Sequence, residues 1–536
     1  MTTILAVSSE ARLDLVLLAV LAAVALFLIV AYHSRIPYPI LLVVGGAVIG
    51  FLPGIPDVQL DPDLVLVIVL PPLLYSAAFF SSLRDLRDNL RPIGMLSIGA
   101  VIATMVAVAV VAHAVVDGMS WEAAFVLGAV VSPTDAIAAT AIASRVGAPS
   151  RFVTIIEGES LVNDATALVA FKFAVAAAVS GSFSLATASG RFALNAVVGI
   201  AIGIAVGWVV AQVRRVIDDA PTEITISLLS PYFAYLPAEA LGVSAVLAAV
   251  TTGVFMGWRS PQLITPATRI QAFAVWEIVQ FVLNAALFVL VGLQLPSVID
   301  GISDMPTRTI VADAVAVAAT VVVVRFLWVY PAVYIPRFLS ARLRERDPYP
   351  PWWMPAIVGW TGMRGAVSLA AALAIPATIE GGAPFPQRDL IIFLTYAVIA
   401  ATLILQGTTL PLIIKALGVE EDGSAAQRES KARLLAARAA IARIDQLTDE
   451  EWVREDTAER VKRGYEFRIR RFEARFDDED DGSIDARSYD YQRLVRELLE
   501  AQRAEIIRLR NMGKINDEIM HRIERDLDLE DTRLEV

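Results

Sequence analysis

Three carboxylates, a serine and an asparagine stand close together in the stretch EGESLVNDATA, residues 157–167. The residues on either side are apolar enough to lie in hydrocarbon, where ionisable groups are costly and mark ion pathways. On a helix, Glu157, Ser160 and Asp164 share one face. Carboxylate and hydroxyl oxygens can replace the water around a hard cation. The stretch therefore predicts a cation-binding face inside a membrane helix.

A second polar interruption precedes this helix, at Ser132-Pro133-Thr134-Asp135. Proline lacks a backbone donor and frees carbonyl oxygens, which adds oxygens of the kind that a cation binds. With a rise of about 1.5 Å per residue, Asp135 and Asp164 lie about 20 Å from opposite membrane surfaces. Both aspartates are therefore predicted near the middle of the membrane.

The other charged groups in apolar segments have simpler predicted roles. Glu159 is expected to form a structural ion pair with Arg364, an arginine between two glycines. Lys172 is expected to extend to the outer surface, and Arg325 to be structural. Asp164 then has no fixed partner unless Lys172 reaches it. A carboxylate without a counter-charge can exchange a cation for a proton.

Thirteen apolar runs predict an all-α polytopic membrane protein. They are placed near 12–32, 38–53, 63–82, 92–116, 121–145, 151–179, 190–213, 221–236, 240–257, 270–295, 308–335, 351–379 and 388–415. The fifth and twelfth spans are interrupted, at SPTD and at TGMRG, and run in opposite directions. Paired interrupted helices in inverted halves indicate a binding site at mid-membrane.

The arginines predict the orientation of these spans. The loops that fall on one side of the membrane in this arrangement carry 14 arginines, whereas the span ends on the other side carry four. Because positive charge is retained in the cytoplasm, the N-terminus is predicted outside and the C-terminal tail inside the plasma membrane.

Charge divides the chain into two predicted domains. The chain has 536 residues and is 56% hydrophobic, with a mean hydropathy of +0.61. Residues 416–536 carry 31 acidic and 23 basic residues, more than half of all the charges. Residues 1–415 are therefore predicted as the transmembrane domain, and residues 416–536 as a cytoplasmic, helical, regulatory tail with an acidic loop at 477–482.

The composition also excludes several classes of function. The chain contains no cysteine, so disulfides and thiolate metal sites are ruled out. Its net charge of −11 argues against a nucleic-acid partner. No HExxH motif or nucleotide-binding loop is present, so an enzyme is not expected, and no cofactor is implied.

Four segments together resemble the signature segments of the sodium/proton exchangers. They are LPPLLYSAAFF, VVSPTDAIAATAIA, EGESLVNDATALV and TGMRGAVSLA, and the likeness covers about residues 10–415. The resemblance implies a thirteen-helix inverted-repeat fold, a homodimer, and elevator-like movement of a core domain. It also implies lipid and monovalent cations as the partners.

The resemblance further implies roles for individual residues. Asp164 would bind the cation, Na⁺, or the proton, with Ser160 and the Thr134 main chain beside it. Asp135 and Asn163 would pair where the fifth and sixth helices cross.

Two further positions bear on the ions that are transported. Glu157 is expected to line the path by which the ion approaches. The departure from the family pattern is at Ser76, where many members have a glutamate, and this places the choice between Na⁺, Li⁺ and K⁺ in question.

The predicted function is a secondary antiporter that exchanges Na⁺ or Li⁺ for H⁺ by alternating access, for pH and sodium homeostasis. Relatives that move net charge have two adjacent aspartates, whereas this chain has Asn163-Asp164, which implies electroneutral one-for-one exchange. The alternatives are a K⁺/H⁺ antiporter and, from another class, a cation channel gated by the tail.

Overall fold

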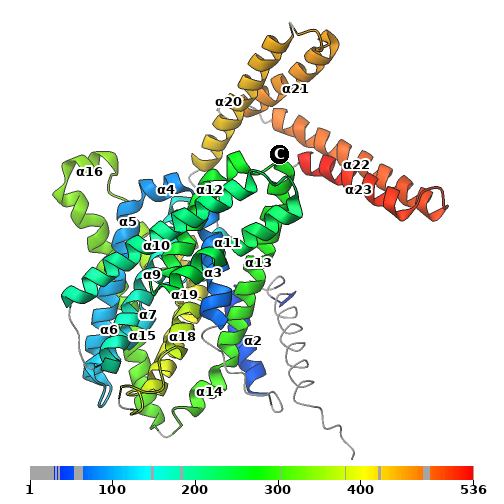
Figure 1. Cartoon of the computed structure of the whole chain (residues 1–536). Helices are drawn as coiled ribbons and strands as arrows, with labels where there is room; N and C mark the ends of the chain where they lie inside the picture. The colour runs from blue at the N-terminus through cyan, green and yellow to red at the C-terminus, as the bar shows by residue number, and fades with distance from the viewer. Residues whose placement is uncertain are drawn as a thin grey trace, which may run out of the picture. The chain divides into compact units, whose positions relative to one another are not determined.

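The computed structural model describes residues 29–30, 33, 37–52, 64–145, 150–180, 185–303, 305–380, 382–419, 424–448, 450–474 and 483–534. These residues are helical apart from turns and one isolated bridge between Thr378 and Pro384. The chain divides into two compact units, Met1–Glu420 and Glu421–Val536. Figure 1 shows the helices of the first unit packed side by side.

The helices of the first unit follow one another without an intervening strand in the described residues. They are α2 Tyr38–Gly50, the π-helical η1 Leu64–Val69, α3 Leu70–Phe80, α4 Leu83–Asp88, α5 Leu90–Gly94, η2 Met95–Ala100, α6 Val101–Val115, α7 Trp121–Val131, α8 Ala136–Arg145, α9 Ser150–Ser180, α10 Leu185–Arg214, α11 Ala220–Ala240, α12 Ala245–Leu263, α13 Pro266–Leu293, α14 Leu295–Asp300, α15 Thr307–Leu339, α16 Ala341–Arg346, α17 Trp353–Trp360, α18 Ala366–Leu373 and α19 Arg388–Ala416.

Seven helical segments in the described part of the chain are long and apolar enough to cross a membrane, and two shorter apolar helices accompany them. Helices occupy every predicted span from the second to the thirteenth. The first predicted span, 12–32, lies almost entirely outside the described residues. The helical class is confirmed, whereas the count of thirteen and the inverted repeats stay predictions.

The surface of α15 shows why these helices need a bilayer. Val311 and Val315 are 54% and 62% exposed and lie about one turn apart on the same side of the helix. Val317 and Val321, on another side, are fully buried. An apolar surface of this extent is stable only against lipid or another protein.

Glycines allow the helices that carry the site to pack closely. A Cβ on Gly292 of α13 would lie 2.2 Å from the carbonyl oxygen of Val43 on α2. A Cβ on Gly257 of α12 would lie 2.2 Å from the carbonyl oxygen of Phe79 on α3. Small residues are how membrane helices approach each other so closely, because lipid provides no hydrophobic force between them.

The two predicted interruptions are present, and they meet each other. Four residues separate α7 from α8, and five separate α17 from α18. The backbone N–H of Asp135 donates to the carbonyl oxygen of Met363 at 2.7 Å, and Nε of Arg364 donates to the carbonyl oxygen of Val131 at 3.0 Å. Each break thus satisfies backbone groups that the other exposes, as buried polar groups require.

The described residues of the second unit form four helices: α20 Ser424–Leu447, α21 Glu455–Ala474, α22 Ser483–Asn511 and α23 Asp517–Leu534. They form two hairpins, α20 with α21 and α22 with α23 (Figure 1). Leu499, Ile506, Met520 and Leu527 form the apolar contact of the second hairpin. The helices predicted for the tail are therefore confirmed, while the predicted acidic loop lies outside the described residues.

Candidate functional site

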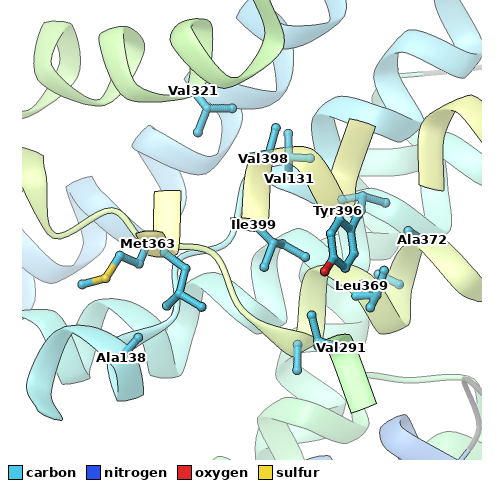
Figure 2. Close-up of a cluster of buried hydrophobic side chains, with 14 of the residues drawn as sticks. Val131, Ala138, Val291, Val321, Met363, Leu369, Ala372, Tyr396, Val398 and Ile399 are labelled. Carbon is cyan, nitrogen blue, oxygen red and sulfur yellow. The ribbon is translucent and has the colours of Figure 1, made fainter. Parts of the chain in front are cut away.

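A cavity of about 640 Å³ lies beside the crossing of the two breaks. Its walls come from α3, α8, α9, α13 and α18 together with both breaks. Behind the crossing, the side chains of Val131, Met363 and Ile399 are buried in the large apolar cluster (Figure 2). The polar groups of the breaks are therefore held between an apolar core and the cavity.

Asp164 lines this cavity and is 7% exposed. Within the described residues, its carboxylate makes no hydrogen bond and no ion pair. The charge that acts on it is that of Asp135, which is of like sign. The described residues of the cavity wall include four carboxylates, Asp135, Glu157, Asp164 and Glu277, and no lysine or arginine. This cavity therefore favours a cation or a proton over an anion.

Thr134 is the centre of the polar network beside Asp164. The hydroxyl of Ser160 donates to the Thr134 carbonyl oxygen at 3.0 Å and accepts from the Ala136 N–H at 3.3 Å. The hydroxyl of Thr134 donates to Oε1 of Glu159 at 3.1 Å. The structure thus brings Ser160, the Thr134 main chain and Asp164 to one cavity wall, and what they bind stays a prediction.

The predicted pairing of Asp135 with Asn163 is wrong. Oδ1 of Asp135 accepts from the N–H of Ile137 at 2.8 Å, and Nδ2 of Asn163 donates to Oγ1 of Thr134 at 2.7 Å. Asp135 directly precedes α8, where unpaired N–H groups compete for a carboxylate. Asn163 therefore turns to the neighbouring threonine.

The predicted ion pair of Glu159 with Arg364 is also wrong. Glu159 pairs with Arg325 of α15, whose Nη1 and Nη2 lie 2.5 and 2.9 Å from its two carboxylate oxygens. Arg364 donates instead to the carbonyl oxygens of Val131 and Gly362. Those carbonyls belong to the end of α7 and to the second break, so they satisfy a guanidinium without a carboxylate. An arginine near the middle of an apolar 33-residue helix was the sequence signal for this partner.

Three other predicted positions have distinct outcomes. Ser76 is fully buried, donates to the Leu73 carbonyl oxygen at 3.0 Å, and is not among the residues of the cavity wall, so its effect on ion selectivity stays a prediction. Glu157 does line the cavity. Lys172 is exposed and lies 3.0 Å from Glu239, so it does not neutralise Asp164.

One wall of the cavity was not predicted. Glu277, Gln280 and Asn284 of α13 line it at i, i+3 and i+7 spacing. The sequence pattern that could have predicted this wall is three polar residues spaced to share one face of a largely apolar helix. Such a face is typically turned toward water or ions.

These features define a polytopic α-helical membrane protein with an acidic cavity at two crossed, interrupted helices. A family profile described as sodium/hydrogen exchanger, transmembrane, matches residues 17–416. An uncharacterized Na⁺/H⁺ exchanger of Mycobacterium tuberculosis is 38% identical over 527 residues, which are 97% of this chain and 96% of that protein. The chain therefore belongs to the sodium/hydrogen exchanger family.

Two further similarities extend the comparison. A sodium, potassium, lithium and rubidium/H⁺ antiporter of Bacillus subtilis is 33% identical over 411 residues, 74% of this chain and 61% of that protein. The sodium proton antiporter MjNhaP1 from Methanocaldococcus jannaschii, solved at pH 8, has a TM-score of 0.58 at 18% identity and covers 74% of this chain and 99% of its own. The second likeness is one of fold, and together they confirm the predicted family and helical class.

Proposed function

We propose that this protein exchanges Na⁺ or Li⁺ for H⁺ across the plasma membrane, one for one, by alternating access. The observation that carries the proposal is Asp164, a buried carboxylate on an acidic cavity with no counter-charge among the described residues. Membership of the exchanger family supports the same reaction class. The physiological result would be control of cytoplasmic pH and sodium.

Coupling follows from the cost of burying a charge. A lone ionised carboxylate out of water is strongly unfavourable, so the carboxylate of Asp164 is stable there only with a cation or a proton on it. One carboxylate cannot hold both, because the proton removes the charge that binds the cation. Each crossing with a cation must therefore alternate with a crossing with a proton.

The oxygens for the cation come from groups that already have positions on the wall. The Ser160 hydroxyl and the Thr134 carbonyl oxygen lie 3.0 Å apart beside Asp164, and both are ligands that a small hard cation accepts. We assign no titrating role to Asp135, because its carboxylate caps α8. Asn163 carries no charge, so the exchange should be electroneutral.

K⁺/H⁺ exchange is the second candidate. The Bacillus subtilis relative is a sodium, potassium, lithium and rubidium/H⁺ antiporter by name, so K⁺ is a candidate substrate here as well. Chloride salts of Na⁺, Li⁺ and K⁺ tested on one vesicle preparation would separate the candidates. A cation channel gated by the tail would instead conduct without moving protons.

The arrangement in the membrane belongs to the same proposal. The 14 to four distribution of arginines supports an external N-terminus and a cytoplasmic tail, residues 416–536, with a regulatory role. The homodimer and the elevator-like movement are carried over from the family resemblance.

The decisive experiment is Asp164→Asn in everted membrane vesicles, with a fluorescent dye reporting the proton gradient. We expect Na⁺-dependent proton movement to be lost while the protein still inserts. Asp389→Asn, at an exposed carboxylate outside the cavity wall, should retain activity. Retained exchange in Asp164→Asn would overturn the proposal.

The stoichiometry needs a separate test in proteoliposomes. An imposed membrane potential should leave the exchange rate unchanged if one cation replaces one proton. A rate that follows the potential would contradict the one-for-one exchange while leaving the antiport reaction intact.

A further inference from the structure

Two helices present oxygen-bearing side chains to the cavity at the same spacing. Glu157, Ser160 and Asp164 lie at i, i+3 and i+7 on α9, and the α13 stripe of Glu277, Gln280 and Asn284 repeats that pattern. The two stripes therefore face one cavity from two different walls.

Exposure decreases along each stripe in the same order. On α13, Glu277 is exposed, Gln280 is half-buried and Asn284 is 7% exposed. On α9, Glu157 is half-buried, and Asp164 at the other end is also 7% exposed. The α13 stripe thus has an acidic, open end and a neutral, buried end.

The buried end of this stripe is unsatisfied. Oδ1 of Asn284 is buried and has no hydrogen-bond partner among the described residues, and the same is true of Oγ of Ser368 on α18. Both residues line the cavity, and α13 packs against α18. A buried oxygen without a donor costs about 1–3 kcal/mol, and at the wall of a cavity a water molecule or a bound cation can satisfy it.

We propose that the α13 stripe is a second wall of the cation path, on which Asn284 Oδ1 coordinates the monovalent cation and so determines its affinity and selectivity. This inference rests on the proposed antiport and deepens it. The open end, with Glu277, concentrates cations by charge. The buried amide and the Ser368 hydroxyl then replace water with neutral oxygens around the cation.

A neutral oxygen suits this position for a physical reason. A carboxylate at the buried position of Asn284 would bind a cation strongly and would itself take up a proton, which would change the stoichiometry. An amide oxygen contributes to binding without titrating. Selectivity can therefore change at Asn284 while coupling stays with Asp164.

The test compares Asn284→Leu, which keeps the approximate size but has no oxygen, with Asn284→Asp, which keeps Oδ1 and replaces the NH₂ group with a second oxygen. Proton movement is measured in proteoliposomes against NaCl, LiCl and KCl. For Asn284→Leu we expect KM for Na⁺ to rise about tenfold, equivalent to about 1.4 kcal/mol, with kcat within about twofold of the parent. The order of the KM values for Na⁺, Li⁺ and K⁺ should also change, and a merely structural role of Asn284 would not change that order. Asn284→Asp should keep a low KM.

Gln271→Leu is the matched control, because it removes an amide from an exposed position of α13 outside the cavity wall. Its KM should equal that of the parent. Should Asn284→Leu fail to fold, Ser368→Ala and Glu277→Gln provide the test. Ser368→Ala should raise KM at any ionic strength. Glu277→Gln should raise KM by about twofold to threefold at low ionic strength only, because salt screens an exposed charge.

The outcomes separate this inference from the antiport itself. Exchange retained in Asp164→Asn overturns the proposed function. Suppose instead that Asp164→Asn loses exchange while Asn284→Leu, or the two substitute variants, keep the parental KM and the parental order of ion affinities. That result overturns only the role of the α13 stripe.

Discussion

Replacing Arg325 by methionine removes the partner of Glu159, and we expect this change to be strongly destabilising. The guanidinium and carboxylate are 3% and 1% exposed and make two contacts of 2.5 and 2.9 Å. Loss of one member of such a pair leaves an uncompensated buried charge and costs about 3–5 kcal/mol. Arg325 also donates from Nε to the Val358 carbonyl oxygen at 3.2 Å, so the loss should lie toward the upper end of that range.

Three companion variants attribute this cost to the pair itself. Arg325→Lys keeps the charge but loses the two-point contact, so an intermediate loss is expected. Glu159→Gln alone leaves the buried arginine unpaired and should also destabilise. The double variant Glu159→Gln with Arg325→Met leaves no unpaired charge, so it should cost less than either single change.

The assay is the free energy of unfolding in detergent micelles, obtained from denaturant titration of the purified protein. The same double-mutant cycle is run on Glu159 and Arg364. A larger coupling energy for Arg364 than for Arg325 would refute the assignment of Arg325 as the partner of Glu159.

Three further predictions concern other parts of the chain. Gly365→Ala should reduce exchange at least about tenfold, measured by dye quenching in vesicles, because the added Cβ would lie 2.3 Å from Oδ2 of Asp135 at the crossing of the breaks. Asp347→Asn should lower the free energy of unfolding by about 1.5–3 kcal/mol, because three arginines share this carboxylate at 2.5, 3.0 and 3.5 Å. At the start of α11, hydrogen bonds lower the pKa of Asp219 below its ordinary value of 3.8. The stabilising effect of this carboxylate is therefore complete above that value and is lost as pH falls through the lowered pKa. We expect Asp219→Ala to lower the free energy of unfolding at a pH of about 7 and to leave it unchanged at a pH of about 2, as measured by denaturant unfolding at the two pH values.

Each of these predictions has a control in the same chain. Gly94→Ala, where an added Cβ meets nothing within 4 Å, should retain exchange, and equal losses in both glycine variants would contradict the crossing argument. Asp88→Asn lies on the neighbouring exposed helix α4, and it should leave stability unchanged if the arginine cluster is the cause. Asp218→Ala removes an adjacent carboxylate that does not cap the helix, so a pH-dependent loss equal to that of the capping residue would contradict the third prediction.

Much of the fold follows from local properties of the chain. A run of apolar residues must satisfy its backbone groups internally in lipid, and this alone predicts helices over 151–179 and 388–415, where α9 and α19 lie. Pro133 and the glycines around Arg364 predict breaks, and both breaks are present. These features depend on neighbours within a few residues and are therefore readable from sequence.

The side-chain partners could not be read in the same way. Arg325 and Arg364 are chemically equivalent candidates for Glu159, and the chosen one lies 166 residues away along the chain. Which arginine comes within 3 Å depends on how α15 and the second break pack against α9. The sequence contains the groups but not these distances.

The sequence by itself determined that Asp164 lies on a polar helix face, between interrupted spans, in a membrane protein of this family, because spacing and hydropathy are local. Only the tertiary structure decided that Glu159 belongs to Arg325 and that Asn163 donates to Thr134. It also left Ser76 off the cavity wall and brought α9 and α13 to the same cavity. Those outcomes depend on the packing of distant helices, which decides among several local pairings of similar free energy.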